Sequence, residues 1–175
     1  MASVQIRAVT GRDFEEEVFG IRGKKHTGHW SLATFEEALL YTISHQPWNP
    51  SSPQTVIACR LYDLVDVKIR SANNNPLSLC VSIGQTLDYL YGIDAFFLHN
   101  SRFVPIDVTL WDGDIKKKHN PDIPDIVIIK KEDIENEKLF EEKAFKIAER
   151  LKTDPPITFL MGVRCRYGQI KLKSR

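Results

Sequence analysis

The sequence has little of what several common kinds of functional site require. Its three cysteines, Cys59, Cys80 and Cys165, are far apart and form no Cys-x-x-Cys pair, which argues against a structural zinc site and a disulfide framework. It contains no glycine-rich phosphate-binding loop and no Gly-x-Ser-x-Gly motif, which removes the usual markers of nucleotide-driven and nucleophilic enzymes. No apolar run approaches the length of a membrane span, and the start lacks the apolar run of a signal peptide. We therefore expect a soluble, intracellular, cytoplasmic protein with reduced thiols and no membrane partner.

Charge of one sign is not in excess either. The chain has 24 Lys and Arg against 23 Asp and Glu, a formal net charge of +1 in 175 residues. The overall balance therefore indicates no polyanionic partner, and a face that binds nucleic acid would have to be built by segregating charge. With 42% hydrophobic and 27% charged residues, the composition is that of a globular protein, and the length predicts a single domain over 1–175.

Hydrophobic periodicity and turn signals predict the order of the elements. Helices are expected over 12–19, 31–41 and 137–151. The second helix has two possible starts, with Ser31 as N-cap or with Thr34 and Glu37 as a capping box. Strands are expected over 55–59, 64–69, 77–83, 93–98, 103–111, 126–129 and 157–163, and loops over 46–53, 71–76 and 112–124. This order predicts an α/β or α+β fold in which helices flank a mixed central β-sheet.

One predicted hairpin brings two carboxylates together. If its turn is centred on Asn100 and Ser101, pairing outward places Asp94 opposite Asp107, with Thr109 on the same face. Opposed Cβ atoms lie about 4.5–5.5 Å apart and like charges there repel, so the pair needs a counter-charge. A hard divalent cation held by oxygen ligands is the simplest one. Two alternatives stay open: the register slips by one residue, or Asp94 ends a loop before its strand.

This pattern resembles the PD-(D/E)xK nuclease superfamily, the restriction-endonuclease-like proteins. That family places an acidic residue at the opening of one strand and an (Asp/Glu)-x-Lys motif on the next, and segment 11–18 is similar to its first helix. The resemblance implies a mixed sheet flanked by helices and Mg²⁺, or Mn²⁺, as cofactor. It also implies metal ligands at Asp94, Asp107 and the Val108 carbonyl, with Glu15 joining them from the helix.

The sequence departs from the family where the family has its lysine. That lysine orients the attacking water and stabilises charge on the phosphate, but Thr109 stands in its place. Lys116 or Lys68 would have to replace it. With such a cation the resemblance implies an endonuclease that hydrolyses phosphodiester bonds, with DNA as its partner and a homodimer as a possible assembly. Without one, it implies a non-catalytic nuclease-fold subunit for nucleic-acid binding or assembly. An accessory protein of unrelated fold is the third possibility, so enzymatic activity stays open.

Clusters of basic residues supply candidate contacts to phosphates. They are Lys24 and Lys25 after the first helix, and Lys116, Lys117 and Lys118 after the hairpin. Cationic side chains that neutralise phosphates release condensed counterions and so favour binding. The other interpretation of these runs is a solvated loop. The basic segment 164–175 equally predicts a nucleic-acid-binding edge or a solubilising tail.

Overall fold

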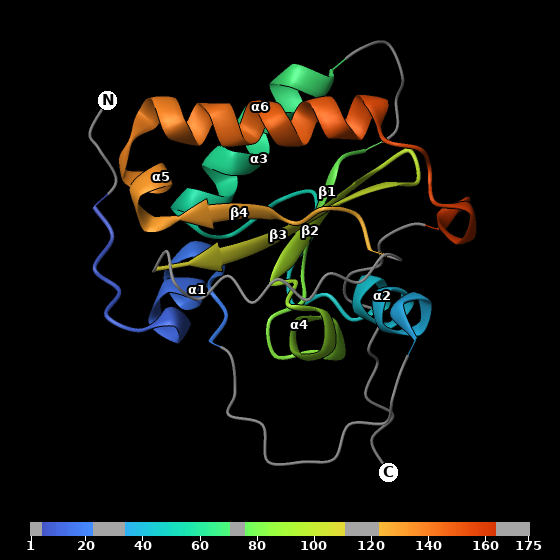
Figure 1. Cartoon of the computed structure of the whole chain (residues 1–175), viewed down its shortest axis with the longest axis horizontal. Helices are drawn as coiled ribbons and strands as arrows, with labels where there is room; N and C mark the ends of the chain where they lie inside the picture. The colour runs from blue at the N-terminus through green and yellow to red at the C-terminus, as the bar shows by residue number, and fades with distance from the viewer. Residues whose placement is uncertain (1–4, 23–33, 71–75, 111–122, 164–175) are drawn as a thin grey trace.

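The computed structural model describes residues 5–22, 34–70, 76–110 and 123–163, and it shows an α+β fold with a four-stranded mixed sheet flanked by helices (Figure 1). The elements in chain order are α1 (Gly11–Phe19), α2 (Phe35–Ser44), α3 (Val56–Ile69), β1 (Ser78–Val81), α4 (Thr86–Tyr91), β2 (Ala95–His99), β3 (Arg102–Thr109), β4 (Val127–Lys130), α5 (Lys131–Glu135), α6 (Glu137–Thr153) and the short 3-10 helix η1 (Thr158–Leu160). The predicted mixed sheet is therefore confirmed. None of the helices that the structure describes is long and apolar enough to cross a membrane.

The sheet has the strand order β1-β2-β3-β4. β1 pairs with β2 and β2 pairs with β3 in antiparallel fashion, and β4 runs parallel to β3. Asn100 and Ser101, with φ values of 51° and 61°, close the β2–β3 hairpin, and two positive φ values are typical of type I′ turns, whose twist matches that of the strands. Leu98 pairs with Phe103, so the predicted register is confirmed.

Helices cover both faces of the sheet, and two buried clusters fill the space between the layers. α3 and α6 lie together over one face (Figure 1), where their apolar side chains form one cluster with those of α1. α2 and α4 contribute to the second cluster on the other face. Successive residues of a strand point to opposite faces. Ile106 and Val108 belong to the first cluster and Phe103 to the second, so Asp107 leaves β3 on the side of α2 and α4.

Helix α3 replaces the two strands predicted over 55–59 and 64–69. Its Val and Ile residues favoured strands, yet its buried residues recur at helical spacing: Ile57, Ala58, Leu61, Val65 and Ile69. Thr55 caps the helix by accepting a hydrogen bond from the Ala58 N–H at 3.1 Å. These five apolar side chains lie on one face of the helix and are buried against the sheet and α6.

Further elements differ from the sequence-based expectation, and α2 settles an alternative that the sequence left open. The strand predicted over 157–163 is wrong: this segment holds η1, and the Ile157 N–H donates one hydrogen bond to the Ser101 carbonyl at 2.8 Å instead of joining a ladder. Helix α4, with Gly92 as its C-cap, was not predicted. Thr34 is the N-cap of α2 and forms the predicted capping box with Glu37.

Helix α1 is anchored to the start of α3. The Thr55 hydroxyl donates a hydrogen bond to the Val18 carbonyl at the end of α1. Gly20, the C-cap of α1, has a φ of 73°, and a Cβ there would lie 3.1 Å from Thr55 Cγ2. This close approach fixes the position of α1 beside the sheet, and with it the position of Glu15.

Candidate active site

Asp94 is held rigidly where β2 begins. It lies one residue before the strand, with its N–H donating to the Ile106 carbonyl at 2.9 Å and its carbonyl accepting from the Ser82 N–H at 2.8 Å. Its carboxylate Oδ2 accepts a hydrogen bond from the Val108 N–H at 2.8 Å. The side chain is buried, at 4% exposure. Asp94 therefore continues the hairpin register although it precedes the strand, and neighbouring backbone fixes its carboxyl group.

Asp107 meets Asp94 as the hairpin pairing predicts. A side-chain hydrogen bond with Asp94 lowers the pKa of Asp107, and two carboxyl groups can form such a bond only when one of them carries a proton. Burial is the main cause that raises the pKa of each, and the charge of Asp107 raises the pKa of Asp94 further. In the absence of a cation, the pair is therefore expected to hold a proton.

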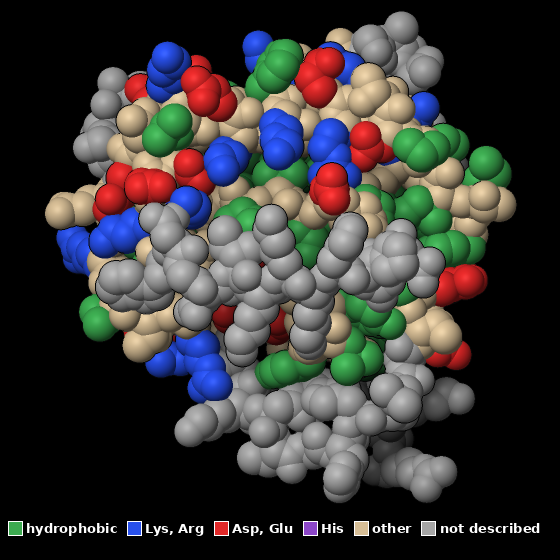
Figure 2. Space-filling model, in the orientation of Figure 1, with side chains coloured by type: hydrophobic (Ala, Val, Ile, Leu, Met, Phe, Trp, Pro, Cys, Tyr) green, Lys and Arg blue, Asp and Glu red, His purple; other side chains and the backbone are tan. Residues whose placement is uncertain are grey.

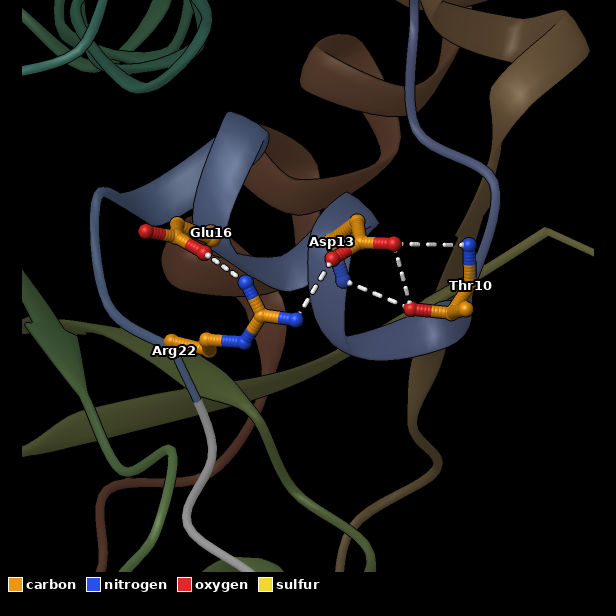
Figure 3. Close-up of polar contacts among 4 residues, drawn as sticks. All are labelled: Thr10, Asp13, Glu16 and Arg22. Atoms are coloured by element: carbon orange, nitrogen blue, oxygen red, sulfur yellow. Dashed lines mark hydrogen bonds and ion pairs between the residues drawn. The ribbon is translucent and has the colours of Figure 1, made fainter.

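Two acids of α1 are neutralised on its outer side (Figure 3). Arg22 lies 2.9 Å from Asp13 and 3.2 Å from Glu16, and all three side chains are substantially exposed. Asp13 also completes the capping box with Thr10 at the start of the helix. These two carboxylates therefore stabilise α1 and are directed away from Asp94 and Asp107.

Glu15 is the acid of α1 that joins the buried pair. Glu17 is occupied elsewhere, since it accepts hydrogen bonds from the backbone N–H groups of residues 7–8 at 2.9–3.1 Å. Burial raises the pKa of Glu15 to about 7, and the charges of Asp88 and Asp107 raise it as well. Glu15 is therefore the glutamate of α1 whose pKa responds to Asp88 and Asp107, and its role in the site stays a prediction.

Asp88 is a fourth member of this group, and sequence reasoning missed it. It lies in the first turn of α4, where its Oδ2 accepts a hydrogen bond from the Gly84 N–H at 2.8 Å. Burial raises its pKa to about 6 despite that hydrogen bond, and the charge of Asp107 raises it too. A helix of six residues between two strands is too short to give a periodic signal, so the sequence does not mark Asp88 as a site residue.

We call Glu15, Asp88, Asp94 and Asp107 the carboxyl cluster. Its members come from α1, α4, the start of β2 and β3, and the pKa of each is raised. Partly buried carboxylates that repel one another need protons or a cation. Their hard oxygen donors suit Mg²⁺ or Mn²⁺. As the described side chains stand, no three His, Cys, Asp or Glu residues form a group that could hold a metal ion. A cation would first have to displace the proton shared by the two aspartates.

The predicted cations fall into two groups. The first group lies outside the described residues, so its roles stay predictions; it consists of Lys24, Lys25, Lys116, Lys117 and Lys118. Lys68 as a substitute for the family lysine is wrong: it lies 5.8 Å from the Phe145 ring, between α3 and α6 on the other side of the sheet. The Val108 carbonyl as a metal ligand also stays a prediction, and the Val108 N–H donates a hydrogen bond to Asp94.

Basic and acidic side chains alternate over α5 and α6. Figure 2 shows them side by side on this face, and Lys131 lies 3.8 Å from Glu135 while Lys152 lies 3.2 Å from Glu149. Ion pairs of this kind leave little net charge for a polyanion to bind. These helices therefore offer a weak surface for nucleic acid compared with a segregated basic face.

No protein-family model, curated protein or solved structure matches this chain. The functional interpretation therefore stands on the residues of the chain itself.

Proposed function

We propose that the chain is a metal-dependent nuclease of the PD-(D/E)xK kind that hydrolyses phosphodiester bonds, with DNA as the expected substrate. The observation that carries this proposal is the convergence of four carboxyl groups with raised pKa values at the β2–β3 hairpin. The strand order supports it, because an antiparallel meander followed by a parallel strand places the Asp94–Asp107 pair at the middle of a mixed sheet, as in that family.

Each member of the carboxyl cluster has a distinct part in this proposal. Asp94 and Asp107 would hold Mg²⁺ or Mn²⁺, with Asp88 and Glu15 beside them. When bound, the cation would polarise a phosphate oxygen and lower the pKa of a bound water. The Val108 N–H keeps Asp94 oriented through its 2.8 Å hydrogen bond. Glu15, with a pKa of about 7, is suited to accept a proton near neutral pH.

A non-catalytic function of the same site is the second candidate. Thr109 favours it, since this residue brings no positive charge to the position where the family has lysine. The carboxyl cluster would then bind metal and nucleic acid without cutting. Binding and cleavage therefore have to be measured separately.

A cleavage assay separates the two functions. Labelled single-stranded and double-stranded DNA and RNA are incubated with the protein in Mn²⁺, in Mg²⁺ and in EDTA, and the products are resolved by size. We expect internal cuts in DNA with either metal and none in EDTA, since hydrolysis needs the cation.

The same assay applies to site variants such as Asp107→Asn. Their matched control is Asp63→Asn, because Asp63 is an exposed acid of α3 far from the site. It should cleave like wild type. Metal and DNA binding without cleavage would establish the non-catalytic function, whereas cleavage that persists in EDTA would contradict a metal-dependent mechanism.

A further inference from the structure

A site in which a phosphate group lies next to several carboxylates needs positive charge in addition to that of the metal. The transferring phosphoryl group gains negative charge, and fixed cations or hydrogen-bond donors at that point stabilise it. Register makes Lys130 the first cation to consider, because it pairs with Thr109 in the adjacent parallel strand. Its ammonium group, however, lies 3.6 Å from Glu132, at a hollow that Lys131 and Glu135 also line. Lys130 is therefore directed toward the end of the sheet, where acids partly neutralise it.

Arg12 lies closer to the carboxyl cluster. It is in the first turn of α1, three residues before Glu15, so both side chains emerge on one face of the helix with Cβ atoms about 5–6 Å apart. Its charge lowers the pKa of Glu15 and also that of Tyr89 on α4. Arg12 therefore shares a face of α1 with Glu15, and its charge reaches Tyr89 on α4.

Arg12 also differs from Arg22, the arginine that follows α1. Arg22 is engaged by Asp13 and Glu16, as Figure 3 shows. Arg12 is exposed, and among the described residues no carboxylate forms an ion pair with it. An exposed guanidinium at the edge of a partly buried group of acids is placed to meet an anion arriving from solvent, and its planar fork suits phosphate oxygens.

We propose that Arg12 binds a phosphate group of the nucleic acid held at the carboxyl cluster and supplies there the positive charge that Thr109 does not. This inference rests on the proposed function, since it places the substrate backbone across α1. The carboxyl cluster alone would repel a phosphate. The metal and Arg12 together would offset that repulsion from two sides.

The test compares Arg12→Ala and Arg12→Lys with the matched control Arg22→Ala. Cleavage is measured in Mn²⁺, and DNA binding is measured in Ca²⁺ over a range of salt concentrations. Arg12→Ala should lower kcat/KM about 100-fold and reduce the salt slope of binding by about one unit, because one charged phosphate contact is lost. Arg12→Lys should recover part of the rate, and Arg22→Ala should cleave like wild type.

Titration with Mn²⁺ distinguishes this role from a structural one. Removing a nearby positive charge should leave the Mn²⁺ affinity of Arg12→Ala unchanged or a few-fold tighter, whereas loss of fold would weaken it. If Arg12→Ala cleaves and binds DNA like wild type, the proposed contact is wrong while the nuclease function stands. If wild type itself binds neither Mn²⁺ nor DNA, the function fails, and the role of Arg12 fails with it.

Discussion

Asp107→Asn should lower Mn²⁺-dependent cleavage about a thousandfold while making the metal-free protein more stable. Cleavage is lost because the variant lacks an anionic oxygen that would hold the cation. The cation would stabilise the transition state by several kcal/mol. The gain follows because the pKa of Asp107 is raised by burial, so ionising it in the folded state is unfavourable. An Asn amide can donate a hydrogen bond to Asp94 in place of the shared proton.

Both effects come from one variant and are measured separately. Cleavage is followed with labelled DNA, and stability by thermal unfolding in EDTA at pH 8. Asp63→Asn, the exposed control on α3, should change neither. A variant that loses activity only because it unfolds at a lower temperature would contradict the assignment of Asp107 as a metal ligand.

The stability of the metal-free protein should fall as the pH rises from about 4 to 7, and Mn²⁺ should reverse the fall. Glu15 titrates at about 7 against a usual value of 4.5, and Asp88 at about 6 against 3.8. Because these folded-state pKa values are raised, the unfolded chain ionises first. The stabilisation is fully present while the pH is below the pKa values of the unfolded chain. It is lost progressively as the pH rises, and the loss ends once the pH exceeds the pKa values of the folded state.

The expected loss is about 1–3 kcal/mol for the two groups after allowance for solvent screening, which corresponds to a fall of about 5 °C in Tm. Mn²⁺ at about 100 times its Kd should restore roughly 3 kcal/mol at pH 7.5, since it binds the ionised carboxylates. Thermal unfolding of wild type and of Glu15→Gln/Asp88→Asn isolates these groups from the rest of the chain. Equal pH dependence in the two proteins would show that neither pKa is raised by the fold.

The hairpin could be predicted from the sequence because its information is local. Polar Asn100 and Ser101 between two apolar runs set the turn, and the turn sets the register that pairs Leu98 with Phe103. The position of Asp94 relative to Asp107 then follows from counting. The capping box of Thr34 and Glu37, one of the two starts that the sequence left open for α2, is equally local, since it lies within four residues.

The rest of the candidate site depends on long-range contacts. Which acid of α1 faces the sheet depends on the backbone of residues 7–8, which engages Glu17, and on the anchoring of α1 through Thr55, and the local sequence expresses neither. Asp88 enters the site because α4 packs on the same face as Asp107. Helix α3 was missed because its β-branched residues mimic strands until burial on both the sheet and α6 selects the helical period.

The central claim is that the carboxyl cluster binds a divalent cation, and calorimetric titration of Mn²⁺ at pH 7.5 tests it most directly. Wild type and Asp63→Asn should bind with a heat that depends on the buffer, because carboxyl groups with raised pKa values release protons as the metal binds. Asp94→Asn/Asp107→Asn should show no binding. Absence of binding in wild type, or equal affinity in the double variant, would contradict the claim.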